Sequence, residues 1–298
     1  MLRYVALLLI SSVAWADVEV RDNEVWLVRD GQERQLTHDG KAKLQAALSP
    51  GNDKIAYYEQ CPEAEHCTPS VVILDLDGKR LQSFQARPAT SPDDSGPCLS
   101  VLNIFWVWSG AIGVECHATP SASEYVEVDL ATGKNVRDLA GLGFTPSPDG
   151  KFIAHVGPII HFAPPYAQSY YLMIDNTIVY PLPKGSKPRP SNQSIDVVQW
   201  RGKRAIGIHQ FVPNFSWSPD SSQVAFIDCT FDWIQKGIAD DGATPFGDET
   251  NRRCSLAVVA INGTFSLFPL SDVPLDQISW QDDRHIKVTD TQIIRVRR

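Results

Sequence analysis

The stretch Phe215-Ser-Trp-Ser-Pro-Asp-Ser-Ser-Gln-Val-Ala-Phe-Ile-Asp228 contains the pattern that decides the fold. An apolar strand end leads into Ser-Pro-Asp, and a second apolar strand follows the turn. Proline fixes the backbone at the start of such a turn, and aspartate hydrogen-bonds the turn backbone. The same unit recurs as Thr145-Pro-Ser-Pro-Asp-Gly-Lys-Phe-Ile-Ala-His-Val156 and as Ala47-Leu-Ser-Pro-Gly-Asn-Asp-Lys-Ile-Ala-Tyr-Tyr-Glu59. This self-similarity predicts a repeat architecture built from β-hairpins.

A second kind of hairpin follows these units. Val71-Val-Ile-Leu-Asp-Leu-Asp-Gly-Lys-Arg-Leu81 has an Asp-Gly turn between two apolar runs, which is a strong hairpin signal. Similar hairpins are expected over residues 125–136, 171–179 and 256–265, and weaker copies of the first unit over 105–115 and 278–288. Each repeat therefore contains four strands. Four strands in a repeat of roughly 40 to 60 residues are typical of a propeller blade.

These repeats resemble those of TolB-like β-propellers over most of the chain. The resemblance implies an all-β fold, a β-propeller of five to six four-stranded blades. Residues 196–212 are either a half-blade or an inserted hairpin, so the blade number stays open. The hairpin over 25–36 is expected to join the strands after residue 277. The N- and C-terminal strands would then close the ring and remove exposed sheet edges.

The N-terminus has the features of a secretory signal peptide over residues 1–16. Arg3 precedes the apolar run Val5 to Ile10, and Ala14-Trp15-Ala16 places small residues at the cleavage positions. Residues 17–298 are then expected to form one propeller domain, periplasmic or secreted after cleavage. No segment approaches the roughly 20 apolar residues that a membrane span requires.

Charge and cysteine content limit the function classes. The net charge of −8 argues against a nucleic-acid-binding surface, which needs a basic stripe. An even set of cysteines in an exported chain predicts disulfides, although the sequence alone does not determine their connectivity. The repeat logic favours bridges within single blades. These are Cys61–Cys67, Cys98–Cys116 and Cys229–Cys254.

Three loops depart from the repeat, over residues 158–169, 182–194 and 231–253. Loops on a rigid scaffold often carry function, and apolar exposed loops favour a partner surface. The predicted binding residues are the apolar and aromatic side chains and one histidine in two of these loops: Ile159, His161, Phe162, Tyr166, Phe231, Trp233 and Phe246. We therefore expect a monomeric binding or scaffold module, without a cofactor, for another exported protein or peptide.

An alternative is a secreted enzyme, a carbohydrate lyase or hydrolase with its site at the central channel. Its candidates are His117, His155 and His209, which lie near the ends of predicted strands and, in this alternative, share a metal. Their distances from the strand starts differ, and neighbouring positions on a strand point to opposite faces. The sequence contains no Gly-x-Ser-x-Gly nucleophile motif. The question of catalysis is left open, with the binding module favoured.

Overall fold

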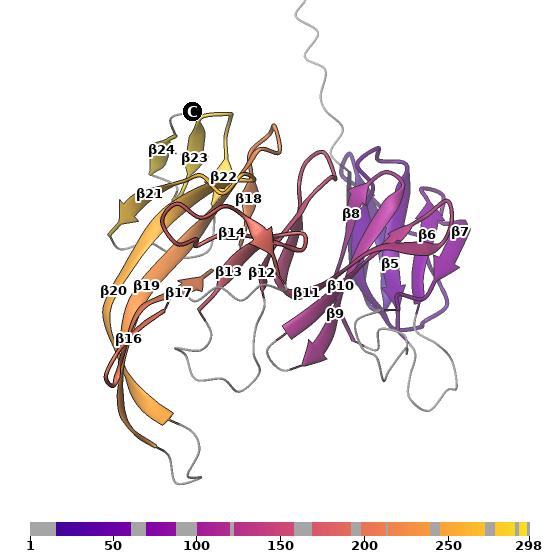
Figure 1. The fold of residues 1–298 in the computed structure, drawn as a ribbon. Helices are drawn as coiled ribbons and strands as arrows, with labels where there is room; N and C mark the ends of the chain where they lie inside the picture. Colours follow the sequence, from indigo (N-terminus) through magenta and orange to yellow (C-terminus); the bar gives the residue numbers. More distant parts are fainter. Residues whose placement is uncertain are drawn as a thin grey trace, which may run out of the picture.

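The computed structural model describes residues 16–60, 70–87, 100–119, 122–157, 169–191, 198–212, 214–238, 245–271, 278–289 and 292–296. Every regular element in these ranges is a β-strand, which confirms the all-β prediction (Figure 1). The predicted signal peptide lies outside the described residues except for Ala16. No helix in the described ranges is long and apolar enough to cross a membrane.

The first two sheets are antiparallel and follow the chain in order. A three-stranded sheet contains β1 (Ala16–Arg21), β2 (Glu24–Arg29) and β3 (Gln32–Gln35). A four-stranded sheet contains β4 (Lys43–Leu48), β5 (Lys54–Glu59), β6 (Ser70–Asp75) and β7 (Arg80–Phe84). The second sheet has the predicted blade topology, with one hairpin around each kind of turn.

The next eight strands form one continuous sheet. They are β8 (Val101–Trp108), β9 (Ala111–Thr119), β10 (Ala122–Asp129), β11 (Lys134–Pro146), β12 (Ile153–Gly157), β13 (Tyr171–Ile174), β14 (Thr177–Tyr180) and β15 (Arg189–Pro190). The sheet is continuous because β11 is long. Its first part pairs with β10 and its last part pairs with β12.

Two further sheets complete the described chain. A six-stranded sheet contains β16 (Gln199–Arg201), β17 (Arg204–Phe211), β18 (Ser216–Trp217), β19 (Gln223–Ile238), β20 (Pro245–Ala260) and β21 (Phe265–Leu270). The last sheet contains β22 (Ser279–Trp280), β23 (His285–Lys287) and β24 (Ile293–Arg295). Residues 199–211 thus form an inserted hairpin, whose second strand pairs with β19.

The serine of each Ser-Pro turn holds that turn together. Ser49, Ser147 and Ser218 are buried. Each Oγ accepts a hydrogen bond, 3.0 Å long, from the backbone N–H five residues further on. A short polar side chain that satisfies the local backbone favours a turn over continued strand. This explains why three distant segments of the chain fold alike.

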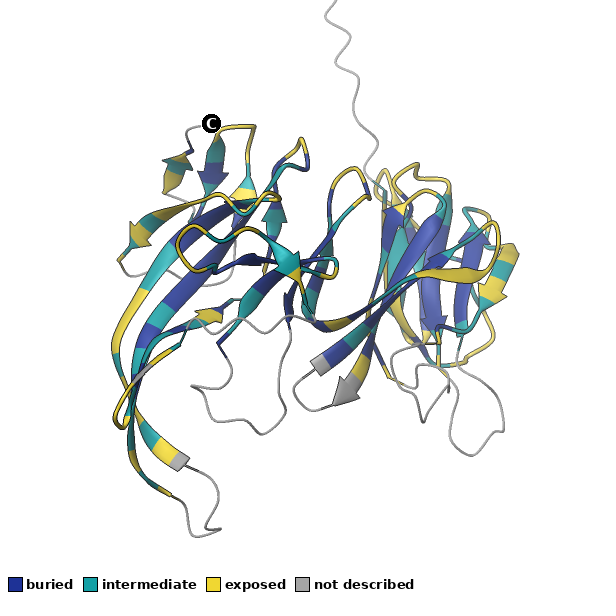
Figure 2. Ribbon diagram, in the orientation of Figure 1, coloured by how far each residue is buried: buried dark blue, intermediate teal, exposed yellow. Residues whose placement is uncertain are grey.

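Apolar clusters fill the space between consecutive sheets. One representative pair for each of the four interfaces, in chain order, is Val25 with Tyr57, Tyr58 with Ile112, Tyr180 with Phe226, and Ile227 with Ile286. A fifth cluster, with Tyr125 and Ile153, lies between the two parts of the eight-stranded sheet that β11 joins. Strands in the middle of the sheets, such as β5, β6 and β12, are therefore buried on both faces (Figure 2). Burial on both faces accounts for their nearly continuous apolar sequences.

Tryptophans also join neighbouring sheets. The indole N–H groups of Trp106, Trp217 and Trp280 donate to the backbone carbonyls of Ala47, Thr145 and Ser216, each over 3.0 Å. Trp217 and Trp280 are the last paired residues of the first strand in their hairpins, and Trp106 pairs with Ile112 just before the end of β8. These three tryptophans pack between neighbouring sheets, whereas Trp108 is 47% exposed.

The two terminal sheets remain separate. Among the described strands, no hydrogen-bonded pairing joins β1–β3 to β22–β24. Ring closure and a count of five or six blades therefore stay predictions.

Candidate functional site

The hairpin of β19 and β20 is the main departure from the repeat. Both strands have 16 residues. On the β20 side, β21 pairs only as far as Cys254. We call residues 230–238 and 245–253 the arm; it projects beyond the sheet at the lower left of Figure 1. The predicted loop over 231–253 is wrong for these two segments, because they continue the strands.

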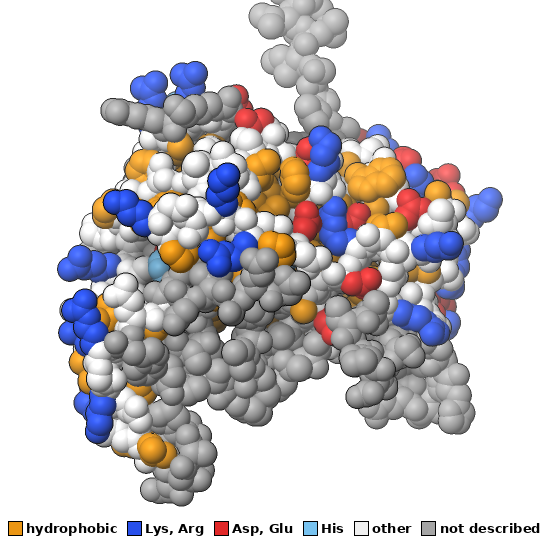
Figure 3. Space-filling model, in the orientation of Figure 1, with side chains coloured by type: hydrophobic (Ala, Val, Ile, Leu, Met, Phe, Trp, Pro, Cys, Tyr) orange, Lys and Arg blue, Asp and Glu red, His pale blue; other side chains and the backbone are white. Residues whose placement is uncertain are grey.

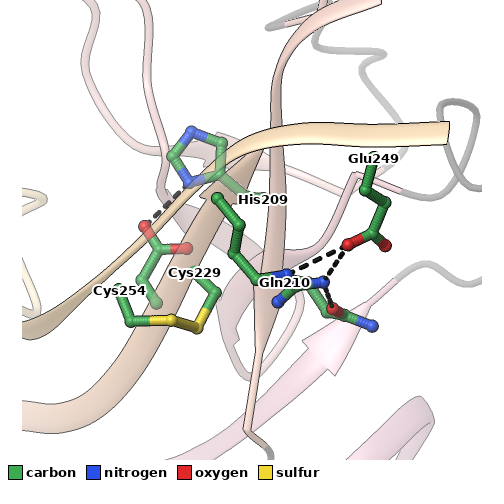
Figure 4. Close-up of a disulfide and its surroundings, with 7 residues drawn as sticks. His209, Gln210, Cys229, Glu249 and Cys254 are labelled. Carbon is green, nitrogen blue, oxygen red and sulfur yellow. Dashed lines mark hydrogen bonds and ion pairs between the residues drawn. A yellow bond between two sulfur atoms is a disulfide. The ribbon is translucent and has the colours of Figure 1, made fainter. Parts of the chain in front are cut away.

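A disulfide joins the two strands at the base of the arm. Cys229 and Cys254 are directly opposite each other in the ladder, with their Cα atoms 4.0 Å apart (Figure 4). This is one of the predicted pairs. Cys116 is also disulfide-bonded, whereas Cys61, Cys67 and Cys98 lie outside the described residues. The bridge fixes the register of the hairpin where it leaves the sheet.

Arg252 braces the arm just beyond the disulfide. Its guanidinium donates to Glu249 over 3.0 and 2.8 Å and to Gln210 over 2.7 Å (Figure 4). It also lies over the ring of Phe231, 4.8 Å from the centroid. A cation over an aromatic face is attracted by the ring quadrupole. One side chain therefore connects β17, β19 and β20.

A β-bulge places Arg252 in this position. Thr230 pairs with Arg253, and the next pair is Asp232 with Thr250, so β20 contains one extra residue at this point. Asn251 takes up the distortion with φ of 58°, and its side chain donates to Asp232 over 2.9 Å. Bulges commonly redirect a neighbouring side chain, as this one does.

The inner face of the arm is apolar and covered. Phe231 and Trp233, both predicted binding residues, are only 4% and 2% exposed. They cluster with Ala205 and Ile208 of β17. Their burial assigns them a packing role, which holds the inserted hairpin against the arm.

The end of the arm is apolar and open. Phe246, also a predicted binding residue, is 53% exposed, and Ile238 on the opposite strand is 55% exposed. The Phe246 ring lies over Gly237, where an added Cβ would come within 2.7 Å of it. Lys and Arg side chains line the margin of the molecule on which β19 and β20 lie (Figure 3).

A buried polar cluster lies beside the base of the arm. The Tyr180 hydroxyl donates to Asp228 Oδ2 over 2.7 Å, and His209 Nδ1 lies 2.8 Å from the same oxygen. Burial and the neighbouring carboxylate raise the pKa of Tyr180 well above its ordinary value. Asp228 Oδ1 is buried with no hydrogen-bond partner in the structure. The arrangement fixes the orientation of the His209 ring.

The other predicted histidines have separate surroundings. His117 is exposed on β9. His155 is buried on β12, with Nε2 2.9 Å from the Asp175 carbonyl oxygen, and burial lowers its pKa to about 4. Within the described residues, no three His, Cys, Asp or Glu side chains are placed to hold a metal ion. The predicted binding residues Ile159, His161, Phe162 and Tyr166 lie outside the described residues.

Sequence reasoning missed two important residues, Ile238 and Arg252. The alternation of Phe231 and Trp233 directly after a strand was a signal that β19 continues. No comparable signal exists for Arg252, because its role depends on a bulge and on a partner 42 residues away in the chain.

Comparison with known proteins finds similarity at the level of structure alone. No family model matches it, and no curated protein matches it by sequence. The propeller domain of the Trilobed protease from Pyrococcus furiosus, which has an open velcro topology, is 9% identical. It has a TM-score of 0.47 over 96% of this chain and 81% of that one.

Two further solved structures are similar. TolB from Acinetobacter baumannii is 16% identical, with a TM-score of 0.34 over 86% of this chain and 63% of that chain, less than two thirds of its length. The Cps50 (Swd1) propeller domain from Myceliophteria thermophila is 12% identical, with a TM-score of 0.38 over 95% and 93%. In structure, the chain resembles β-propeller proteins, TolB among them, without being TolB itself.

Proposed function

We propose that this chain is an exported β-propeller module that binds another exported protein or peptide through the tip of the arm. The single observation that carries the proposal is that the arm has a fixed base and an apolar end, formed by Ile238 and Phe246, which we call the tip. Ile238 and Phe246 are exposed on opposite strands of that tip. Apolar side chains held out from a folded surface favour contact with a partner.

The construction of the arm supports this role. The Cys229–Cys254 disulfide and the Arg252 contacts hold the base in one arrangement. A binding element that is already ordered loses less conformational entropy when a partner docks. Export is supported by the signal-peptide pattern of residues 1–16 and by the disulfide, since disulfides persist in oxidising compartments.

Site-specific photocrosslinking in the exporting cell tests the proposal. A photoreactive amino acid at Phe246 should give one discrete adduct with a second exported protein. The matched control places it at Val136, which is similarly exposed on β11. The Phe246 adduct should disappear when Ile238→Asp is added, because the charge makes burial of the tip unfavourable. An adduct of equal yield at Val136, or none at Phe246, would contradict the proposal.

A further inference from the structure

Among the described strands, none lies beside the outer edge of β20 along the arm. β19 covers one side of residues 245–253, and β21 begins to pair only at Cys254. In the described part of the chain, no other strand pairs with this segment. Residues along such an edge direct backbone N–H and C=O groups outward, where another strand can bind.

The charges along this edge change sign at its centre, with two acidic residues on one side and two arginines on the other. Asp248 and Glu249 precede Thr250 and Asn251, and Arg252 and Arg253 follow them. Two copies that pair antiparallel, centred between Thr250 and Asn251, would place Asp248 opposite Arg253. The same register places Glu249 opposite Arg252. Each of these contacts occurs twice, because the arrangement is two-fold symmetric, and opposite charges directly across a strand pair are stabilising.

We propose that the arm is a self-association surface and that its partner is a second copy of this chain. The two β20 edges pair antiparallel around a two-fold axis. A partner strand of one charge sign would meet repulsion from half of the edge, whereas a second copy places its Asp248 opposite Arg253 and its Arg253 opposite Asp248. The proposal goes beyond the tip contact described above and replaces the monomer expected from the sequence.

Within one copy, Glu249 and Arg252 are already paired with each other, so Asp248 and Arg253 provide the charges for this contact. Arg253 makes no ion pair with any described residue. Asp248 contacts Lys236, and both side chains are more than half exposed, so this pair is readily exchanged. The bulge at Asn251, where φ is 58°, lies at the centre of this register and interrupts the ladder there, so pairing is limited to short segments on either side of it. A self-complementary contact of this kind closes at two copies instead of growing into a filament.

Charge reversal in the full-length mature protein tests the proposal. Asp248→Arg places like charges opposite Arg253, and Arg253→Asp places like charges opposite Asp248. By sedimentation equilibrium at low ionic strength, wild type should be dimeric and each variant alone monomeric. A one-to-one mixture of the two variants should form a heterodimer, because the new arginine then faces the new aspartate. The double variant Asp248→Arg/Arg253→Asp should again be a homodimer.

Two control variants distinguish loss of the dimer contact from loss of folding and from loss of partner binding at the tip. Lys236→Gln removes only the internal partner of Asp248 and should leave the dimer intact. Ile238→Asp should abolish partner crosslinking without changing the dimer, so the two proposals fail independently. Without any substitution, raising the ionic strength should dissociate wild type. A wild type that is monomeric throughout, a dimer that persists in either single reversal, or a mixture that stays monomeric would overturn the proposal.

Discussion

At the scale of single residues, tryptophans form repeated connections between sheets. Trp217 lies between the sheets of β12 and β19, where it donates to the Thr145 carbonyl and stacks on Phe152. Thr145 belongs to the strand before the preceding Ser-Pro turn. One indole therefore joins two repeats by a hydrogen bond and by packing, and the two contributions can be separated by mutation.

Trp217→Phe keeps an aromatic ring and removes the N–H donor. We expect a loss of about 1–3 kcal/mol in the free energy of unfolding, because a buried carbonyl loses its partner and some volume is lost. Urea denaturation followed by far-UV circular dichroism measures it. Trp108→Phe is the control, since Trp108 is largely exposed, and it should change stability little. Equal losses in both variants would show that the hydrogen bond is unimportant.

His155 makes stability depend on pH. Burial lowers its pKa from 6.5 to about 4 in the folded protein. As the pH falls below 6.5, the unfolded chain binds a proton at this site and the folded chain does not. The stabilisation is therefore present above pH 6.5 and is lost as the pH falls toward 4. It amounts to about 3 kcal/mol.

His155→Gln should flatten this part of the pH profile. Denaturant unfolding of wild type and variant at pH 7 and pH 4.5 gives the comparison, and carboxylates that titrate in the same range cancel between them. An identical slope in the two proteins would show that His155 is not the group responsible.

At the scale of elements, the arm depends on close contact between its two strands. A Cβ added at Gly247 would lie 2.2 Å from the Ile234 carbonyl oxygen and 2.8 Å from the Trp233 ring. Neither neighbour can move easily, since one is backbone and the other is buried. Glycine at this position therefore allows Trp233 to lie against the opposite strand.

Gly247→Ala should loosen the arm while leaving the sheets folded. Hydrogen exchange followed by mass spectrometry should show faster exchange over residues 230–253 and unchanged exchange over β5 and β12. Gly51→Ala is the control, because its new Cβ would meet only the exposed Asp53 carboxylate, at 3.1 Å, and no backbone atom. Unchanged exchange in the arm would mean that the two strands separate to accept the methyl group.

The arm also shows what sequence could and could not predict. The Ser-Pro turns were predictable because Ser49, Ser147 and Ser218 satisfy the turn backbone within five residues. The hairpins at Asp-Gly and Asn-Gly turns were predictable for the same local reason. The arm was not, because its glycines, asparagine and acids are turn-forming residues in isolation. They belong to strands here because β17 and a disulfide support them.

At the scale of the whole molecule, apolar clusters join consecutive sheets along the chain. The export prediction concerns the N-terminal end of this series of sheets. Cleavage after Ala16 would leave Asp17 as the first residue, within β1. Intact-mass and N-terminal analysis of the exported protein should find a chain that begins at Asp17. Ala14→Arg should block processing, because a small residue is required there. Retention of residues 1–16 in the exported protein would refute this assignment.

Strand β11 has a consequence for how this chain evolves. Repeat proteins usually lengthen or shorten by gaining or losing whole repeats at the boundaries between them. Here one strand supplies hydrogen bonds to β10 with one end and to β12 with the other. A genetic duplication or deletion that cut at this boundary would leave half a strand on each side. The two parts of the eight-stranded sheet that β11 joins would therefore be inherited as one unit, so insertions should accumulate at the other boundaries, as at the β16–β17 hairpin.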